Sequence, residues 1–452
     1  MVSPPDPAAL AKEREWLAEN DAKPLGGRWL GYLSRGGPGY LQSALTLGGG
    51  SASASLFAGA AFGYQLLWVA PMGMLIGMIM MMAIAHQTLS TGMRPFEAMR
   101  VHAGGFFAYG WAIGAMLASV IWHFSQYALA SSLVQEISIL GGGEISRGMG
   151  GGLILVWAVI SAQLFASGSN GMKWFDRLLK VLIWTIVACF GYTVFQTGVD
   201  WGATFKGLVP FRVPSDVVPD ANKPDEVISG LQTVMAGLGA AVVINMVFLY
   251  PYTLLARGWG KEHRGLARFD LFAGMFLPYI LATGLMIIAT ANTIHANGGI
   301  PGKSFGVIDA ASVLSSTLGD GLGTGIFLFG LLGMVMTTIT MHMVSAAFAI
   351  SEMFGLKFGS RGYRLALLIP TPGFLGAFYW SDMAVWVAVP TSIATAALLP
   401  IAYFGFIKLQ RSPAYLGKDM PRGKRARTML GAMAFGTTVV VVFLIWTLIT
   451  KL

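Results

Sequence analysis

The chain has 452 residues and only one cysteine, Cys189, so an intramolecular disulfide is impossible and cysteine usage does not indicate a redox compartment. Charged residues are scarce as well: they make up 11% of the chain, whereas 55% of it is hydrophobic. A soluble domain of this length cannot bury so much apolar surface. The composition therefore excludes the soluble classes and predicts an all-α protein that crosses the membrane several times.

The sequence also lacks the patterns that carry catalysis. It contains no nucleophile–base arrangement, no phosphate-binding loop and no group of metal ligands at a typical spacing. The methionine-rich run 78–82 has no companion Cys or His at ligand spacing, so it indicates packing rather than a soft-metal site. Neither an enzyme nor a bound cofactor is expected.

Apolar runs predict about eleven membrane spans. They cover residues 39–62, 64–90, 105–137, 150–168, 175–198, 227–256, 268–292, 322–354, 364–380, 383–408 and 428–449. Basic residues gather in alternate connections, at 12–35, 94–100, 173–180, 257–268, 357–364 and 408–427. This asymmetry predicts a cytoplasmic N-terminus and an external C-terminus. It also explains the net charge of +9 without a nucleic-acid partner.

The expected organisation is one integral domain in a bacterial-type plasma membrane. Residues 1–37 form a cytoplasmic segment with a surface helix from Asp6-Pro7 through Leu17, and they lack the apolar core of a signal peptide. A ten-helix core at 38–410 divides into repeats at about 38–198 and 227–410. A cytoplasmic loop at 411–427 and an eleventh helix at 428–452 follow. The bilayer is the expected partner, and no obligate protein partner is evident.

Two spans contain helix-weakening residues. Gly48-Gly49-Gly50-Ser51 interrupts the first span, and the sixth contains Gly237-Leu238-Gly239, Asn245 and Pro251. Glycine loses the most backbone entropy in a helix, and freed backbone groups are tolerated at membrane depth only beside protein or a cavity. Matching breaks in two five-helix halves are typical of inverted-repeat transporters, although glycines in membrane helices also serve close packing.

The predicted spans hold no acidic residue near their centres, so weak proton coupling is expected. The neutral polar residues that remain are pathway or coupling candidates: His123, Gln126, Tyr127, Thr337, Thr338 and His342. Each has a simpler interpretation, because a histidine can bond a neighbouring helix and a threonine can return its hydrogen bond to its own helix. His123 is the fallback proton carrier.

Several segments resemble NRAMP-type divalent-metal transporters. Residues 37–40 read GPGY, residues 58–64 read AGAAFGY, and residues 239–250 are similar to the family's sixth-span segment GATVMPHNLFLH. Further counterparts follow in order at 329–332, 368–370 and 399–402, so the resemblance covers about residues 37–410. It implies a LeuT-like fold of 5+5 helices plus an eleventh, alternating access, and a site between spans one and six.

The sequence departs from the family at the metal ligands. The family's DPGN falls on Gly48–Ser51, so its carboxylate and amide ligands are absent, and its MPH falls on Val243–Asn245, so its thioether is absent. The expected substrate site comprises Gly48, Gly49, Gly50, Ser51, Ala240, Val243 and Asn245. Free amides after the break and a pocket enlarged by missing side chains favour a small zwitterionic or anionic organic solute. A hydrated hard divalent cation such as Mg²⁺, or a non-transporting sensor, remains an alternative.

Overall fold

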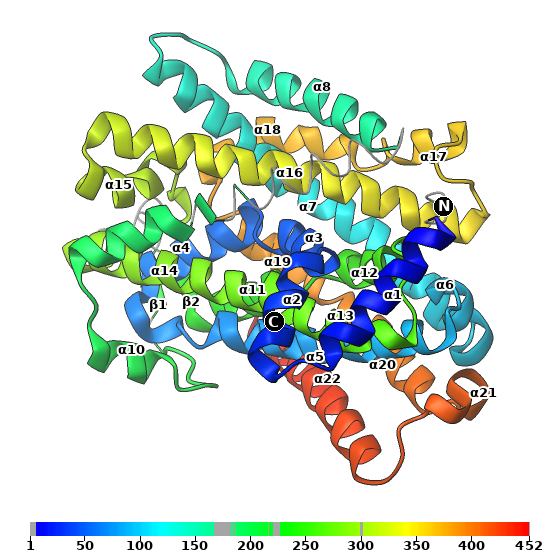
Figure 1. Ribbon diagram of the computed structural model, residues 1–452. Helices are drawn as coiled ribbons and strands as arrows, with labels where there is room; N and C mark the ends of the chain where they lie inside the picture. Colours follow the sequence, from blue (N-terminus) through cyan, green and yellow to red (C-terminus); the bar gives the residue numbers. More distant parts are fainter. Residues whose placement is uncertain are drawn as a thin grey trace.

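The computed structural model describes residues 6–166, 181, 184–185, 187–215, 217–219, 227–298 and 302–451. Over these residues the chain is a bundle of long helices with shorter helices at its margins and a pair of short strands (Figure 1). Eight helical stretches of the described chain are long and apolar enough to cross a membrane. The all-α, multi-span class is confirmed, whereas the count of eleven and the division into repeats stay predictions.

Most predicted spans correspond to long helices. These are α5 (Val69–Thr91), α7 (Gly105–Leu140), α8 (Arg147–Phe165), α16 (Asp320–Phe354) and α22 (Gly423–Lys451). The seventh span is α13 (Arg264–Leu271), which continues through the π turn η4 (Phe272–Phe276) into α14 (Leu277–Thr293). Residues 187–197 are helical too, but the rest of the predicted fifth span lies largely outside the described residues.

Two predicted spans are subdivided. The tenth consists of α19 (Ala388–Ala396) and α20 (Leu399–Gln410). The prediction of one continuous ninth helix over 364–380 is wrong: the chain forms α17 (Arg361–Ala366), the 3-10 turn η7 (Thr371–Leu375) and α18 (Gly376–Tyr379). Pro370 and Pro372 explain the difference, because proline lacks the N–H that an interior helical position must donate.

Short elements complete the described chain. The α-helices among them are α1 (Pro7–Asp21), α2 (Leu25–Arg35), α6 (Pro95–Ala98), α10 (Trp201–Gly207), α15 (Val307–Leu318) and α21 (Pro413–Leu416). A π turn is η2 (Met99–Ala103), and the 3-10 turns are η1 (Gly63–Leu66), η3 (Lys261–His263), η5 (His295–Asn297), η6 (Gly302–Ser304), η8 (Ser381–Met383) and η9 (Gly417–Asp419). Strands β1 (Val217–Pro219) and β2 (Val227–Ser229) pair antiparallel, with Val218 opposite Ile228.

Helix α1 begins where the sequence predicts. The Asp6 carboxylate accepts a hydrogen bond from the amide of Ala8 at 3.1 Å, and Pro7 occupies the first helical position. The helix extends past Leu17 to Asp21, because Asn20 is buried and its Nδ2 donates to the carbonyl of Arg28 in α2 at 3.0 Å. This contact joins the two amino-terminal helices.

The first span is interrupted as predicted. Helix α3 (Pro38–Thr46) ends before Leu47 and Gly48, and α4 (Gly49–Phe62) begins directly afterwards. The break is shorter than the glycine run, however, because Gly49, Gly50 and Ser51 already form the first turn of α4. Gly48 is the one residue of the run that lies in the non-helical segment.

The sixth span is also interrupted, but at a different place from the one predicted. Helix α11 (Gly230–Ala241) and α12 (Ile244–Ala256) meet at Val242 and Val243, which are extended with φ −140° and −104°. Gly237 and Gly239 lie inside α11, where a Cβ at Gly239 would meet the carbonyl oxygen of Ser392 at 2.5 Å. These glycines therefore allow close helix packing, and β-branched valines form the break.

Helices α7 and α16 pack along each other and support both breaks. Each of them contacts α4 of the first interrupted span and α12 of the sixth, and α3 also packs against α12. In Figure 1 the central part of α7 lies behind α16 and close to the blue ribbon of α3 and α4. Residues from four separate regions of the sequence thus meet at the interrupted helices.

Candidate functional site

The break in the first span is closed by a serine hydroxyl. Ser51 Oγ donates to the carbonyl of Thr46, the last residue of α3, and the amide of Leu47 donates to Ser43 O at 2.6 Å. Ser51 thus satisfies the carboxyl end of the preceding half-helix. At the amino end of α4, Gly48 provides no side-chain cap for the helix amides.

The glycine run is packed tightly against α7 and α16. A Cβ at Gly48 would lie 2.1 Å from Oγ1 of Thr338, and one at Gly50 would lie 2.2 Å from the ring of Trp122. At Gly49 a Cβ would meet Val335 Cγ2 at 2.6 Å and Gln126 Oε1 at 2.7 Å. The expectation that missing side chains enlarge the pocket is therefore wrong for this conformation, because neighbouring side chains fill the space.

Packing explains why glycine stands at position 48. Its φ of −99° and ψ of −176° are extended values that any residue adopts, so the backbone itself does not require glycine. The contact with Thr338 does require it. The glycine run 48–50 thus both allows close helix packing and lies at a helix break, two roles that the sequence had left as alternatives.

Asn245 is engaged within the protein. It lies in the first turn of α12, where its Oδ1 accepts from the amide of Met246 at 2.9 Å and its Nδ2 donates to Ser119 Oγ at 3.3 Å. Its carbonyl accepts from Ser345 Oγ at 3.1 Å. Asn245 therefore connects the second break to α7 and α16, while Ala240 and Val243 border that break on the two sides of Val242.

A thioether lies between the two breaks, and the sequence analysis overlooked it. The hydroxyl of Thr46 at the end of α3 lies 3.0 Å from Sδ of Met246 in the first turn of α12. Both residues are buried. The sequence does lack the family's methionine at position 243, but the sulfur of Met246 lies three residues further along the chain. Its position directly after the break was the signal that could have identified it.

His123 and His342 face each other across the α7–α16 contact. Their ring centroids are 5.8 Å apart, and Trp122 and Tyr127 lie 6.2 and 5.7 Å from His342 and His123, respectively. His123 Nδ1 lies 2.8 Å from the carbonyl of Ser119, which can only accept, so Nδ1 carries the proton. In the neutral ring this leaves the lone pair on Nε2.

Several polar atoms around this pair have no partner among the described residues. They are buried, and they include His123 Nε2, His342 Nδ1, Gln126 Oε1, Tyr127 OH and Trp122 Nε1. A buried donor or acceptor without a partner costs about 1–3 kcal/mol, so such atoms are rare and often indicate a bound water, ion or ligand. Their concentration beside the glycine run marks this region as the candidate site.

Helix periodicity explains why the polar side chains of α7, and likewise those of α16, lie on one side of their helix. His123 and Gln126 lie three residues apart on α7, and Thr338 and His342 lie four apart on α16, so each pair shares one side of its helix. Thr337 and Thr338 return their hydroxyls to Gly333 and Met334 of their own helix at 2.8 Å, as the simpler interpretation predicts.

Two carboxylates near the ends of predicted spans serve the fold rather than this cluster. Asp270 of α13 accepts from the amides of Gly37 and Gly39 at 2.8 and 2.6 Å, and it thereby anchors the start of α3. Glu352 near the end of α16 pairs with Arg94. Within the described residues there is no group of three or more His, Cys, Asp or Glu side chains that could hold a metal ion.

Comparison with known proteins gives consistent results. The family described as natural resistance-associated macrophage protein-like (Nramp) matches residues 39–449. The chain is 23% identical over 448 residues to the divalent metal cation transporter MntH of Mycobacterium leprae, with 96% of each protein covered.

Solved structures share the fold. A mutant manganese transporter from Eremococcus coleocola superposes with a TM-score of 0.71 at 15% identity, covering 91% of this chain and 86% of that one. A nucleobase–cation–symport-1 family transporter with bromovinylhydantoin bound gives 0.56 at 14% identity, with 91% and 92% covered. At these identities the likeness shows the LeuT-like transporter fold alone.

Proposed function

Because the chain belongs to the Nramp family of membrane transporters, we propose that it is a secondary-active transporter whose substrate is a metal cation bound by neutral side chains. The observation that carries this proposal is the buried pair His123 and His342, with unpartnered ring nitrogens beside the broken first span. A multi-pass transporter with interrupted helices binds its substrate at such breaks. The proposal replaces the organic solute as the leading hypothesis.

The available donors favour borderline and soft ions over hard ones. Imidazole suits Zn²⁺, Cu²⁺ and Ni²⁺, and thioether sulfur suits softer ions, whereas Mg²⁺ and Mn²⁺ prefer carboxylate and carbonyl oxygen. His123 Nε2 and His342 Nδ1 provide the first type, Met246 Sδ at the second break provides the other, and Gln126 Oε1 adds a neutral oxygen. Relatives named as divalent-metal and manganese transporters support a metal as the class of substrate.

The spacing of the histidines is compatible with a shared ion. With metal–nitrogen bonds of about 2 Å in tetrahedral geometry, two imidazole rings on one ion lie roughly 5 Å apart, centroid to centroid. The observed centroid separation of 5.8 Å is close to this value. We further propose that coupling to protons is weak, since neutral groups replace the intramembrane carboxylates, and that the N-terminus is cytoplasmic.

A small polar organic solute is the second candidate. The neutral donor set favours it, because a bare divalent cation is stabilised poorly without a carboxylate. The tight contacts of Gly48 and Gly50 with Thr338 and Trp122 oppose it, since such a solute needs α4 to move away from α7 and α16.

Thermal unfolding of the purified protein distinguishes these candidates. A ligand that binds the native state raises the midpoint by mass action, so we expect a shift with Zn²⁺ or Ni²⁺ and a smaller one with Mg²⁺. His342→Gln should weaken the apparent affinity at least about tenfold. His102→Gln, which changes a histidine of η2 outside the cluster, is the matched control.

Uptake into proteoliposomes then tests transport. The metal proposal predicts accumulation of the stabilising ion by the wild type and loss of uptake in His342→Gln. A midpoint shift with amino acids or hydantoins and none with the metals would refute it in favour of the organic candidate. Binding of the metal without uptake under any imposed gradient would instead support a sensor. Uptake that depends steeply on a pH gradient would contradict weak proton coupling.

A further inference from the structure

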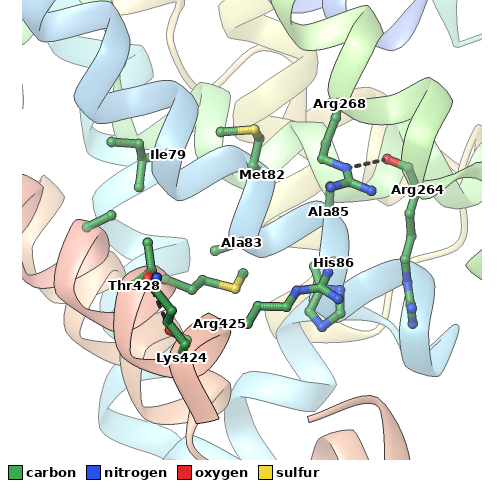
Figure 2. A pocket seen from close by; sticks show the side chains of 12 residues that line it. Ile79, Met82, Ala83, Ala85, His86, Arg264, Arg268, Lys424, Arg425 and Thr428 are labelled. Atoms are coloured by element: carbon green, nitrogen blue, oxygen red, sulfur yellow. Dashed lines mark hydrogen bonds between the residues drawn. The ribbon is translucent and has the colours of Figure 1, made fainter. Parts of the chain in front are cut away.

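A groove with a volume of about 530 Å³ lies where three helices meet at the basic end of the bundle. Its walls are the last turns of α5, the helix α13 and the first turns of α22, and its lining side chains can be followed in Figure 2. The groove is distinct from the candidate site, since none of the residues described there lines it.

One half of the groove is apolar. Ile79, Met82 and Ala83 of α5 line it together with Met429 and Ala432 of α22. Hydrophobic side chains that line an open groove at a membrane-facing helix pair can contact a lipid acyl chain. This half therefore suits hydrocarbon rather than a soluble polar molecule.

The other half is basic. His86, Arg264, Arg268, Lys424 and Arg425 line it, and the described residues contribute no carboxylate to the lining. The nearest acid is Asp419, which binds Lys261 at 2.6 Å and the guanidinium of Arg264 at 3.0 Å. Arg264 Nε is buried without a partner among the described residues. One carboxylate thus faces four arginine and lysine side chains, so the groove carries a net positive charge.

On each of the two helices a single turn separates the apolar lining from the basic lining. On α5 the change from Met82 to His86 takes one turn, and on α22 the change from Arg425 to Met429 also takes one turn. One helical turn rises about 5.4 Å. A basic layer next to an apolar layer complements a phospholipid, whose anionic headgroup adjoins its apolar acyl chains.

A neighbouring hollow shares part of this basic surface. It has a volume of about 690 Å³ and shares Arg264, Arg268 and Arg425, but Asp21 and Glu262 also line it. Two carboxylates there face five lysine and arginine side chains, so the positive excess extends over both hollows. Basic pockets between membrane helices on the cytoplasmic side attract anionic lipid headgroups.

We propose that this groove binds an anionic phospholipid of the cytoplasmic leaflet. The headgroup phosphate accepts hydrogen bonds from Arg425, Arg264 and Lys424, and an acyl chain lies against Met82 and Met429. Arginine suits this role because its planar fork can donate two hydrogen bonds to one phosphate. The helix that carries Arg264 and Arg268 also carries Asp270, which anchors α3, so the bound lipid holds the helix that positions the first break.

Thermal unfolding in neutral detergent tests the lipid site. Phosphatidylglycerol should raise the midpoint, whereas phosphatidylcholine with the same acyl chains should not. Lys424→Gln with Arg425→Gln should weaken the apparent affinity for phosphatidylglycerol at least about tenfold, since each basic residue near an anionic surface contributes substantially. Both residues are exposed, so the double variant should fold. The matched control is Arg411→Gln with Lys418→Gln, which removes two exposed cations outside the groove.

Three results would overturn the proposal. Equal stabilisation by the two lipids would show that headgroup charge is irrelevant, and wild-type affinity in Lys424→Gln/Arg425→Gln would place the lipid elsewhere. A shift of the same size with inorganic phosphate would show a free-anion site instead of a lipid site. Met429→Glu, which places a carboxylate among the acyl-chain contacts, provides a second variant and should also abolish the response to phosphatidylglycerol.

Discussion

Replacing Gly48 by alanine tests the packing of the first break directly. The backbone at this position tolerates alanine, with φ −99° and ψ −176°, so the substitution introduces no dihedral strain. The new methyl group would lie 2.1 Å from Thr338 Oγ1, 2.9 Å from its Cγ2 and 3.0 Å from its Cβ. Carbon atoms prefer separations of about 3.5–4.0 Å, so either Thr338 or α4 has to shift.

The size of the effect follows from two opposing contributions. An extra methyl in a well-packed core costs about 1–3 kcal/mol. Replacing glycine by alanine at a compatible backbone stabilises by about 0.4–1 kcal/mol, because the unfolded chain loses freedom. We therefore expect Gly48→Ala to destabilise the protein by roughly 0–2.5 kcal/mol, with overpacking the larger contribution.

A double-mutant cycle isolates the contact. Thr338→Ala removes Oγ1 and Cγ2, the two atoms nearest to the new methyl, so Gly48→Ala should be tolerated far better in that background. The measurement is reversible unfolding of the four proteins, and we expect a coupling energy of about 1–2 kcal/mol. Gly284→Ala in α14 is the matched control, because nothing lies within 4 Å of its added Cβ. Additivity of the two changes within about 0.5 kcal/mol would refute the packing described for the break.

Two further predictions concern the sulfur and the basic end of the bundle. Met246→Leu should weaken binding of a soft or borderline ion in a titration, whereas Met343→Leu on the buried side of α16 should not; equal effects would exclude a role for the thioether. Hydrogen bonds from Lys261 and Arg264 lower the pKa of Asp419, so its contribution to stability is present above its usual pKa near 3.9 and lost as the pH falls through the native value. Asp419→Asn should therefore lower the free energy of unfolding at pH 7 by up to about 1 kcal/mol, and this difference should disappear in strong acid. A pH-independent difference would contradict the ion pair.

The fold class could be predicted from the sequence because bilayer physics leaves few options. Long apolar runs and scarce charged residues allow only a bundle of membrane-spanning helices. The first break follows from consecutive glycines, which destabilise a helix. The second break could not be placed in the same way. Gly237 and Gly239 look like a break in sequence, yet they lie at helix contacts, and the interruption occurs at two valines that propensity alone does not single out.

The sequence marked the residues of the histidine cluster as pathway or coupling candidates and not as the substrate site. His123, Gln126 and His342 each stood out as neutral polar groups inside a span. Their proximity depends on how α7 packs along α16, and no local pattern contains that information. Met246 was missed for a related reason. The resemblance places the family's methionine at Val243, whereas the sulfur of Met246 reaches the break from one turn further along α12.

The glycine run has consequences for how the site could open. Ser51 holds α3 and α4 together through Thr46, while Gly48 and Gly50 hold α4 against α16 and α7. Any movement that exposes the unpartnered nitrogens of His123 and His342 to one side of the membrane has to separate these contacts. A larger residue at position 48 or 50 would force α4 outward in all states and would reduce the distinction between open and closed forms. The close packing of the first break therefore depends on glycine at both positions, and it is at this break that the family's ligand side chains are missing.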